Sequence, residues 1–210
     1  NLTGSVGRIT TAGAVTTFTH PGIVDPGAPL LGADGALWFP NGPSSIGRTT
    51  DDGVLTVFSD ARIGSPLALW PGSDGDLYFE AASGIGQITP EGAFSYFPAP
   101  PYPPGATRPS FPDPQRPMYE NVGGSTLGPD GNQWMTVSVH VDFRPYKPVV
   151  YNSAAVVRLT PQGVRTSFPL PDTDTPGEIV AGPDGNLWFA DGTVGRITTD
   201  GVLTFFPTTS

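Results

Sequence analysis

The side chains in this sequence that are best suited to chemistry are few. His20 and His140 are its only histidines, and the absence of Cys excludes thiolate nucleophiles, thiolate metal ligands and disulfides. Glu80 and Asp191 each follow an aromatic-rich segment, from which they could reach a shared hard cation such as Mg²⁺ or Ca²⁺. Such a cation needs several converging oxygens, so two carboxylates are insufficient. We predict no metal site, no cofactor and no catalytic residue.

Sequence motifs of known catalytic sites are also absent. The chain contains no Gly-x-Ser-x-Gly nucleophile elbow, no His-Glu-x-x-His zinc motif and no Gly-rich phosphate loop. Its repeated Asp-Gly pairs lack the alternating acids of a calcium loop and are better explained as tight turns. The residue types therefore favour binding over catalysis.

Cationic and aromatic residues gather in two segments, 98–123 and 138–153. The first is Pro-rich and expected to be extended, and the second alternates enough to form an extra hairpin. In a chain of net charge −9 this mixture suits a protein, a glycan or an anionic small molecule. The alternative is that the Arg side chains pair with nearby acids such as Asp113, Glu120 and Asp142. The candidate binding residues are Tyr102, Arg108, Arg116, Tyr119, His140, Arg144, Tyr146 and Lys147.

A repeated unit provides the elements that must position these segments. Five stretches align without gaps, and each contains a short strand, a turn closing on Gly and a second strand ending in Phe. A second motif, an Asp-Gly turn followed by an aromatic strand, precedes four of them. One unit therefore holds four strands in about 40 residues, which is typical of a β-propeller blade. The stretches begin at Val6, Ile46, Ile85, Val156 and Val194.

The recurring large side chains are predicted to belong to the scaffold. A single blade cannot bury both of its faces, so neighbouring blades must stack on aromatic residues. An Arg that recurs at one position of the repeat is likewise better explained by blade structure than by a single site. The aromatic residues are Phe18, Trp38, Phe58, Tyr78, Phe97, Trp134, Phe168, Trp188 and Phe206, and the recurring cations are Arg8, Arg48, Arg158 and Arg196.

The motifs GPDGNLWF and VGRITTDGVLTFFP, within residues 182–207, resemble the repeat of the streptogramin (virginiamycin B) lyase-like β-propellers. The resemblance covers nearly the whole chain except the two inserted segments. It implies a divalent-metal-dependent lyase that opens a cyclic ester, using His and Glu at the top of the ring, with Mg²⁺ or Ca²⁺ as cofactor. The positions that match the family's His are Gly27, Leu67, Gly123 and Gly177. We therefore keep the lyase as the alternative function.

The predicted fold is all-β, a single propeller domain over residues 1–210. It contains a half blade at 5–18 and complete blades at about 27–58, 66–97, 124–168 and 177–206. The half blade has the last two strands of a unit and lacks the first two. The chain is therefore either a five-blade ring or a fragment of a larger one, and strand addition by another chain could complete the half blade.

One blade departs from the regular spacing. In three units 16 residues separate the last Phe from the Asp of the next turn, whereas Phe97 and Asp130 are 33 residues apart. The connection after Asp130 is also long, because Val156 begins the next stretch 26 residues later. In an antiparallel blade both connections leave from the same face, where repeat proteins usually carry function. We expect the ligand face on this blade.

The composition limits which classes of partner and which cellular location suit this chain. The pI of about 4.4 argues against nucleic acid, since a phosphate backbone would be repelled on average. No apolar run approaches the length of a membrane span. An acidic chain rich in Thr, Ser, Gly and Pro favours a secreted or cell-surface bacterial protein. The sequence thus predicts a non-catalytic extracellular binding or protein-interaction propeller, either acting alone or as a subunit of a multi-chain assembly.

Overall fold

Tight turns shape every predicted hairpin of the chain. Each predicted turn Gly has a positive φ, for example 91° at Gly201 and 76° at Gly185, a conformation that strains other residues. In the turns that close on Gly13, Gly53 and their equivalents, a Thr hydroxyl accepts a hydrogen bond from the backbone N–H four residues later. Thr50 and Val54 show this bond at 3.2 Å. The turn chemistry predicted from the Gly positions is confirmed.

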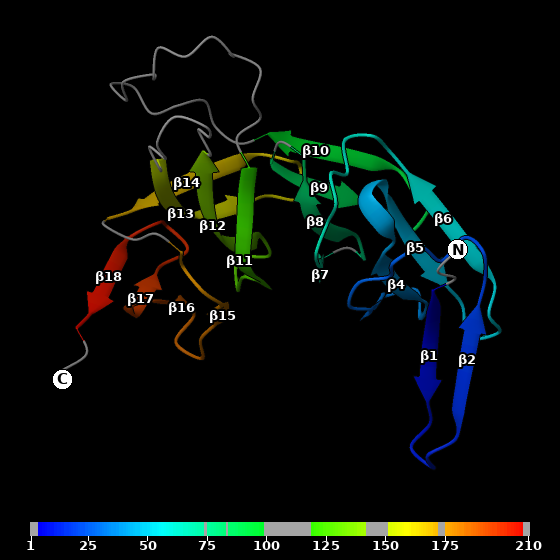
Figure 1. Ribbon diagram of the computed structural model, residues 1–210. Coiled ribbons are helices and arrows are strands. Elements are labelled where there is room, and N and C mark those ends of the chain that lie inside the picture. The colour runs from blue at the N-terminus through cyan, green and yellow to red at the C-terminus, as the bar shows by residue number, and fades with distance from the viewer. Residues whose placement is uncertain are drawn as a thin grey trace, which may run out of the picture. The chain divides into compact units, whose positions relative to one another are not determined.

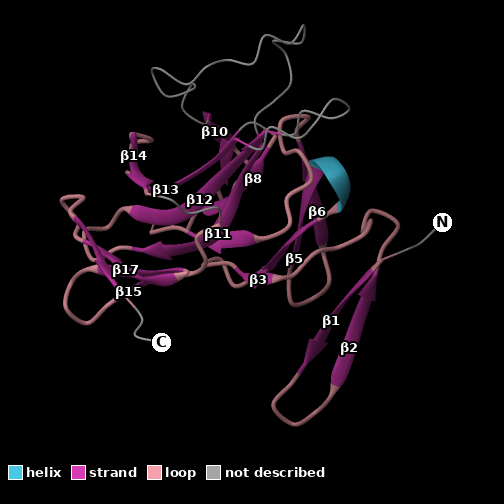
Figure 2. Ribbon diagram, turned by 60° about the vertical axis from the view of Figure 1, so that its left-hand side comes forward, coloured by secondary structure: helices cyan, strands magenta, loops and turns pink. Residues whose placement is uncertain are grey.

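The computed structural model describes residues 4–73, 75–82, 84–98, 119–141, 151–171 and 175–207 (Figure 1). These residues form four four-stranded sheets and one two-stranded hairpin, and in each sheet the strands follow chain order. The single described helix is the short 3₁₀ element η1 (Gly42–Ser44), and strands form the rest of the regular structure (Figure 2). The all-β fold of four complete blades and a half blade is as predicted.

We name the sheets in chain order. The terminal hairpin contains β1 (Ser5–Ile9) and β2 (Val15–Thr19). The first sheet contains β3 (Leu30–Leu31), β4 (Leu37–Pro40), β5 (Ser45–Thr49) and β6 (Leu55–Ser59). The second contains β7 (Leu69–Pro71), β8 (Leu77–Ala81), β9 (Gly84–Ile88) and β10 (Phe94–Pro98). The third contains β11 (Tyr119–Leu127), β12 (Gln133–Val141), β13 (Tyr151–Leu159) and β14 (Arg165–Leu170). The fourth contains β15 (Ile179–Ala181), β16 (Leu187–Asp191), β17 (Thr193–Ile197) and β18 (Leu203–Phe206).

The chain divides into two compact units. The first comprises Asn1–Ala82 and Gly86–Ser95, and the second comprises Ser83–Ile85 and Tyr96–Ser210. In the first unit, Val6 of the terminal hairpin forms a buried cluster with Ile23 and Phe39. In the second unit, a larger cluster joins the third and fourth sheets through residues such as Val156 and Phe189. Each unit therefore has an apolar core of its own.

The same indole–phenyl contact recurs inside the first, third and fourth sheets. The ring of Trp38 stacks on that of Phe58 with centroids 5.4 Å apart, and Trp134 stacks on Phe168 at 5.6 Å. Trp38 and Trp134 are 1 % and 0 % exposed, so both are core, as predicted from their recurrence, whereas Phe206, predicted with them, is 38 % exposed. The stacking partners lie within one sheet, which the repeat alone did not reveal.

The last Phe of each sheet also meets the turn Gly of the sheet that follows it in the chain. A Cβ at Gly53 would lie 2.7 Å from the ring of Phe18, and one at Gly163 would lie 2.9 Å from the ring of Phe97. A Cβ at Gly92 would overlap the ring of Phe58. Each of these turns therefore requires Gly for two reasons: its backbone has a positive φ, and the Phe ring leaves no room for a Cβ.

We predict that Gly92→Ala costs more stability than Gly13→Ala. Both residues have a positive φ, so each substitution should cost about 1 kcal/mol of backbone strain. Gly13 has no described atom within 4 Å of its added Cβ, whereas at Gly92 overpacking against Phe58 adds about 1–3 kcal/mol. Urea unfolding of the two variants measures the difference. Equal losses of unfolding free energy would contradict the Phe–Gly contact.

Candidate functional site

The third sheet extends beyond the repeat at the end where the two inserted segments leave it. Its strands β11, β12 and β13 are nine residues long each, whereas the corresponding strands of the other sheets have two to five. A bulge between Val122 and Gly124 shifts the register of β11 against β12. Residues 138–141 and 151–153 therefore continue β12 and β13, where the sequence predicts a separate hairpin. Three adjacent strands of this sheet therefore continue past the length that they have in the repeat.

Two of the predicted binding residues lie in this extension. The backbone register pairs Tyr119 of β11 with His140 of β12, and His140 with Asn152 of β13. Residues 21 positions apart in the sequence are thus brought opposite one another. The remaining candidates lie outside the described residues, and they are Tyr102, Arg108, Arg116, Arg144, Tyr146 and Lys147.

A buried ion pair stands next to the start of the extension. Arg165 Nη1 donates to Glu120 Oε2 at 2.9 Å, and Arg165 Nη2 donates to Glu120 Oε1. The side chains are 11 % and 0 % exposed, so the bidentate pair is desolvated. Arg165 also donates to the carbonyl of Phe97 at 3.3 Å, which ties the end of β10 to β11 and β14. Glu120, which the sequence offered as a partner for an inserted Arg, is therefore held by a scaffold residue.

Sequence reasoning missed this pair, although a signal for it exists. Arg165 occupies a repeat position that is apolar in the other four stretches, where it holds Val15, Leu55, Phe94 or Leu203. A cation at an otherwise apolar repeat position indicates a buried acidic partner. Its partner Glu120 lies 45 residues away and outside the repeat, so only the structure could identify it.

Strand β12 carries further buried polar side chains below the extension. Thr136, which is 0 % exposed, donates to the carbonyl of Gly177 at 2.6 Å. Gln133 donates to Ser125 Oγ at 2.6 Å, and its Oε1 atom is buried with no hydrogen-bond partner among the described residues. Polar groups of this kind are costly to bury and fix one geometry once they are paired. The two hydrogen bonds tie β12 to Ser125 of β11 and to the backbone at Gly177.

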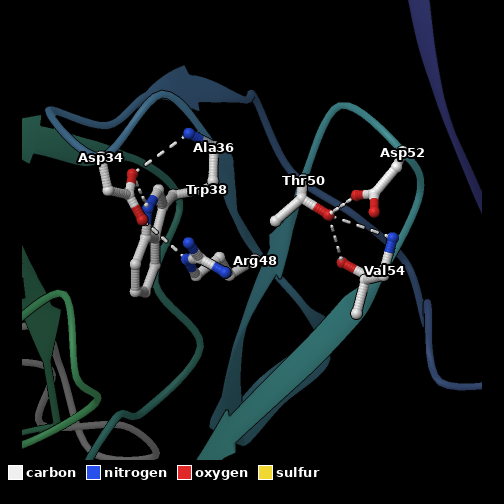
Figure 3. Close-up of polar contacts among 7 residues, drawn as sticks. All are labelled: Asp34, Ala36, Trp38, Arg48, Thr50, Asp52 and Val54. Carbon is white, nitrogen blue, oxygen red and sulfur yellow. Dashed lines mark hydrogen bonds and ion pairs between the residues drawn. The ribbon is translucent and has the colours of Figure 1, made fainter.

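The repeated Arg residues belong to the scaffold, as predicted. In the first sheet the Asp34 carboxylate accepts hydrogen bonds from Trp38 Nε1 at 3.1 Å and from Arg48 Nε at 2.7 Å, and the guanidinium of Arg48 lies over the indole (Figure 3). In the fourth sheet Arg196 lies 5.8 Å from the centroid of the Trp188 ring, which is a cation–π distance. The Arg side chain is thus held over the Trp ring in the first, third and fourth sheets, where it stabilises the sheet.

Two of the turn carboxylates, Asp184 and Asp34, have lowered pKa values. Hydrogen bonds from Asn186 and then from Trp188 lower the pKa of Asp184 to about 2 from its ordinary value of 3.8. At Asp34 burial opposes ionisation, but the hydrogen bonds from Arg48 and Trp38 outweigh it and lower the pKa. A general acid at neutral pH needs a raised pKa, so these carboxylates serve the fold.

Four positions match the His of the lyase-like repeat, and at two of them, Gly27 and Gly123, the neighbouring atoms leave no room for a larger side chain. A Cβ at Gly123 would overlap the carbonyl of Pro176, and one at Gly27 would lie 2.9 Å from the ring of Pro40. Leu67 is 77 % exposed, and Gly177 has only ordinary contacts. The absence of His at Gly27 and Gly123 is thus built into the local packing.

A hollow of 280 Å³ lies in the first unit, beside two of these positions. Four prolines, Pro26, Pro40, Pro43 and Pro66, are among its lining residues, and Asp25 and Ser65 contribute the polar side chains. Both polar residues have a positive φ, 45° at Asp25 and 62° at Ser65, which is strained for a side chain with a Cβ. With one carboxylate and one hydroxyl, the hollow suits binding better than acid–base chemistry.

The described residues contain no group of three or more His, Asp or Glu side chains that could hold a metal ion. Glu80 belongs to β8 in the first unit and Asp191 ends β16 in the second. Within the same described part of the chain, no helix has the length and apolarity needed to cross a bilayer.

Comparisons with known proteins support the fold. No family model and no curated protein matches the chain. It is similar to the extracellular domain assigned to the hybrid two-component system BT4673 of B. thetaiotaomicron, with 13 % identity and a TM-score of 0.59, over 98 % of this chain and 27 % of that one. It is also similar to a protein assigned as a gluconolactonase, with 14 % identity and a TM-score of 0.54, over 95 % of this chain and 68 % of that one. A third similar structure is regucalcin, a calcium-binding protein of Agrobacterium tumefaciens. Its identity is 17 % and its TM-score 0.52, over 89 % of this chain and 60 % of that one.

These solved structures share an all-β propeller architecture with this chain, and identities this low establish the fold alone. The chain spans 27 % of the length of that extracellular domain. The class that fold and sheets define is therefore a β-propeller, and its activity has to be argued from its own residues.

We predict that Arg165 and Glu120 are energetically coupled. Arg165→Leu, which restores the apolar residue of the repeat, leaves Glu120 buried without a partner and should cost about 3–5 kcal/mol of unfolding free energy. The double variant Arg165→Leu/Glu120→Leu should recover most of that loss, because neither charge is then buried alone. Urea unfolding of both single variants and the double variant measures the coupling. Additive losses would contradict it.

We predict that Asp184 titrates with a midpoint near 2 in the folded chain, as its hydrogen bonds require. A lowered folded pKa means that its stabilising contribution is present above pH 3.8 and is lost as the pH falls from 3.8 towards 2. A carboxyl NMR titration measures the midpoint. Asn186→Ala should raise the pKa of Asp184, and Asn132→Ala, the matching change in the third sheet, should leave it unchanged.

Proposed function

We propose that this chain is a non-catalytic extracellular binding propeller. Its partner contacts the extended end of the third sheet, where segments 98–123 and 138–153 leave the repeat. The observation that carries the proposal is the lengthening of three adjacent strands, β11, β12 and β13, to nine residues each in a chain whose other sheets keep to the repeat. Repeat proteins concentrate recognition in such departures, because the scaffold holds them while leaving their sequence free.

The chemistry of the inserted segments favours an anionic glycan as the ligand class. Arg108, Arg116, Arg144 and Lys147 are four of the ten basic residues of the chain, and they stand among several Tyr residues. Aromatic side chains stack on sugar rings, whereas Arg and Lys bind carboxylates or sulfates. A protein partner would use the same side chains as anchors.

The proposed location is outside the cell. The extracellular sensor domain named above has the same fold at 13 % identity, which supports the compatibility of this fold with an extracellular binding role. The composition of the chain favours the same location. Neither argument depends on the identity of the ligand.

The alternative function is metal-dependent opening of a cyclic ester, as in the streptogramin lyases whose repeat this chain resembles. The neighbour assigned as a gluconolactonase has the same fold, at 14 % identity. Against this alternative stands the packing at Gly27 and Gly123, which leaves no room for the corresponding His. A streptogramin B substrate and gluconolactone, each with Mg²⁺ and with EDTA, should show no metal-dependent turnover. Turnover that EDTA abolishes would establish the alternative.

We predict that oligogalacturonate, an anionic glycan, binds the chain and that Arg144→Ala/Tyr146→Ala weakens this binding at least about tenfold. The loss of one charge-assisted hydrogen bond and one stacking ring provides the physical reason. Isothermal titration calorimetry measures the affinity, and circular dichroism should show an unchanged fold.

The matched control is Arg62→Ala, which removes an exposed Arg from a connection without an insertion. It should leave the affinity unchanged. Neutral cello-oligosaccharides should bind more weakly than oligogalacturonate in every variant. Equal affinity of the wild type and the double variant, or no binding of the charged glycan, would contradict the proposed face.

A further inference from the structure

The connection between β4 and β5, in the first unit, is longer than its counterpart in the fourth sheet. Residues 41–44 join these strands and include the 3₁₀ helix η1, which is cyan in Figure 2, whereas Gly192 alone joins β16 to β17. The hollow of 280 Å³ lies beside η1, since Gly42 and Pro43 both line it. The hollow therefore stands at a departure from the repeat, the kind of place where repeat proteins carry function.

The hollow brings together two strained residues. Asp25, with a φ of 45°, and Ser65, with a φ of 62°, are the non-Gly residues with a positive φ in the described part of the chain, and both line it. Each stands ten positions before a turn Gly, Gly35 or Gly75, so the two occupy the same place in successive repeats. The equivalent Asn121 lies within β11, so the repeat does not impose this backbone conformation. Strain held at two matched places indicates side chains positioned for a function.

The lining of the hollow is poor in hydrogen-bond donors. Four of its nine residues are prolines, which have no backbone N–H. The N–H of Gly27 already donates to the carbonyl of Pro40 at 2.9 Å. The N–H of Ser65 donates to the carbonyl of Pro43 at 2.7 Å. Because an anion needs several donors, the hollow does not suit a carboxylate, a phosphate or a sulfate.

The charge of the hollow favours a cation. Asp25 is the one charged residue among those that line it, and its carboxylate has no hydrogen bond or ion pair with the described residues. The hydroxyl of Ser65 lies 3.4 Å from the carbonyl oxygen of Pro43, which is a long hydrogen bond that a ligand could replace. An ammonium group carries three donors and a positive charge, so it matches a carboxylate and a hydroxyl.

The remaining side chains of the hollow are apolar. Pro40 and Pro66 are buried, whereas Leu67 is 77 % exposed and would gain from an apolar cover. The volume of 280 Å³ is near the lower end of ligand pockets, which hold about 300–1,000 Å³. The size therefore suits a small molecule and not an oligomer.

We propose that this hollow binds a small organic cation, a primary ammonium group on a short apolar body. The ammonium group donates to the Asp25 carboxylate and the Ser65 hydroxyl, and the apolar body lies against the prolines and Leu67. The proposal is independent of the anionic ligand proposed for the third sheet, because all nine lining residues belong to the first unit.

Three molecules of similar shape and different charge test the proposal. They are cyclohexylmethylammonium, neutral cyclohexylmethanol and cyclohexanecarboxylate, each titrated into the isotope-labelled 210-residue chain. NMR shifts of the Gly27, Gly42 and Ser65 amides report binding at the hollow. We expect the cation to bind with a Kd on the order of 1 mM. The alcohol should bind about threefold to fivefold more weakly, and the carboxylate should cause no saturable shift.

Asp25→Asn separates the charge from the shape of the hollow. Asn tolerates a positive φ as Asp does, so the chain should fold normally. The variant should bind the cation about threefold to fivefold more weakly, as expected for the loss of one exposed ion pair, and bind the alcohol unchanged. The matched control Asp200→Asn removes the same charge from an exposed turn of the fourth sheet and should leave both affinities unchanged.

Three results would overturn the proposal. The cation fails to shift the amides of the hollow, or the cation and the alcohol bind equally well. Alternatively, Asp25→Asn and Asp200→Asn weaken cation binding to the same extent, which would show a general effect of net charge.

Discussion

Each Trp-containing sheet depends on one indole ring where four parts of the sheet meet. In the fourth sheet, Trp188 donates to Asp184 in the preceding turn at 3.0 Å, lies beneath Arg196 of the next strand and stacks on Phe206 of the last at 5.4 Å. A Cβ at Gly182 would lie 2.5 Å from the same ring, so the residue directly after β15 must be Gly. The register of the sheet follows from this ring, because a shift of one residue would move every partner to the opposite face.

This local origin explains how much of the fold could be predicted from the sequence. The turns depend on Gly at fixed offsets, and the stack depends on aromatic residues of the same repeat unit, so the repeat contains both signals. Strand number, turn position and the scaffold role of Arg48 and Arg196 follow directly. The stacking of Trp38 on Phe58 inside one sheet could not be predicted, because the sequence gives the positions of the aromatic residues but not which of them are in contact.

The candidate site was predictable only in part, for a physical reason. Tyr119 and His140 were identified by residue type, but their pairing depends on how far β11 and β12 extend, and the inserted segments break the spacing that fixes register elsewhere. Arg165 and Glu120 form one pair across 45 residues, and only Arg165 belongs to the repeat. The repeat thus predicts contacts within a unit, whereas contacts that occur once require the structure.

The buried ion pair between Arg165 and Glu120 gives the extended sheet selectivity between conformations, which apolar packing would not. An apolar residue at position 165 would pack about as well, as Leu55 and Leu203 do at the equivalent positions, and a buried charge pair seldom stabilises more than such packing. Its effect is selectivity between conformations, because a register in which Glu120 misses Arg165 leaves two desolvated charges unpaired. A longer ladder has more alternative registers than a short one, and β11 already has a bulge. The pair therefore disfavours registers other than the one that places Tyr119 opposite His140 at the end of the sheet.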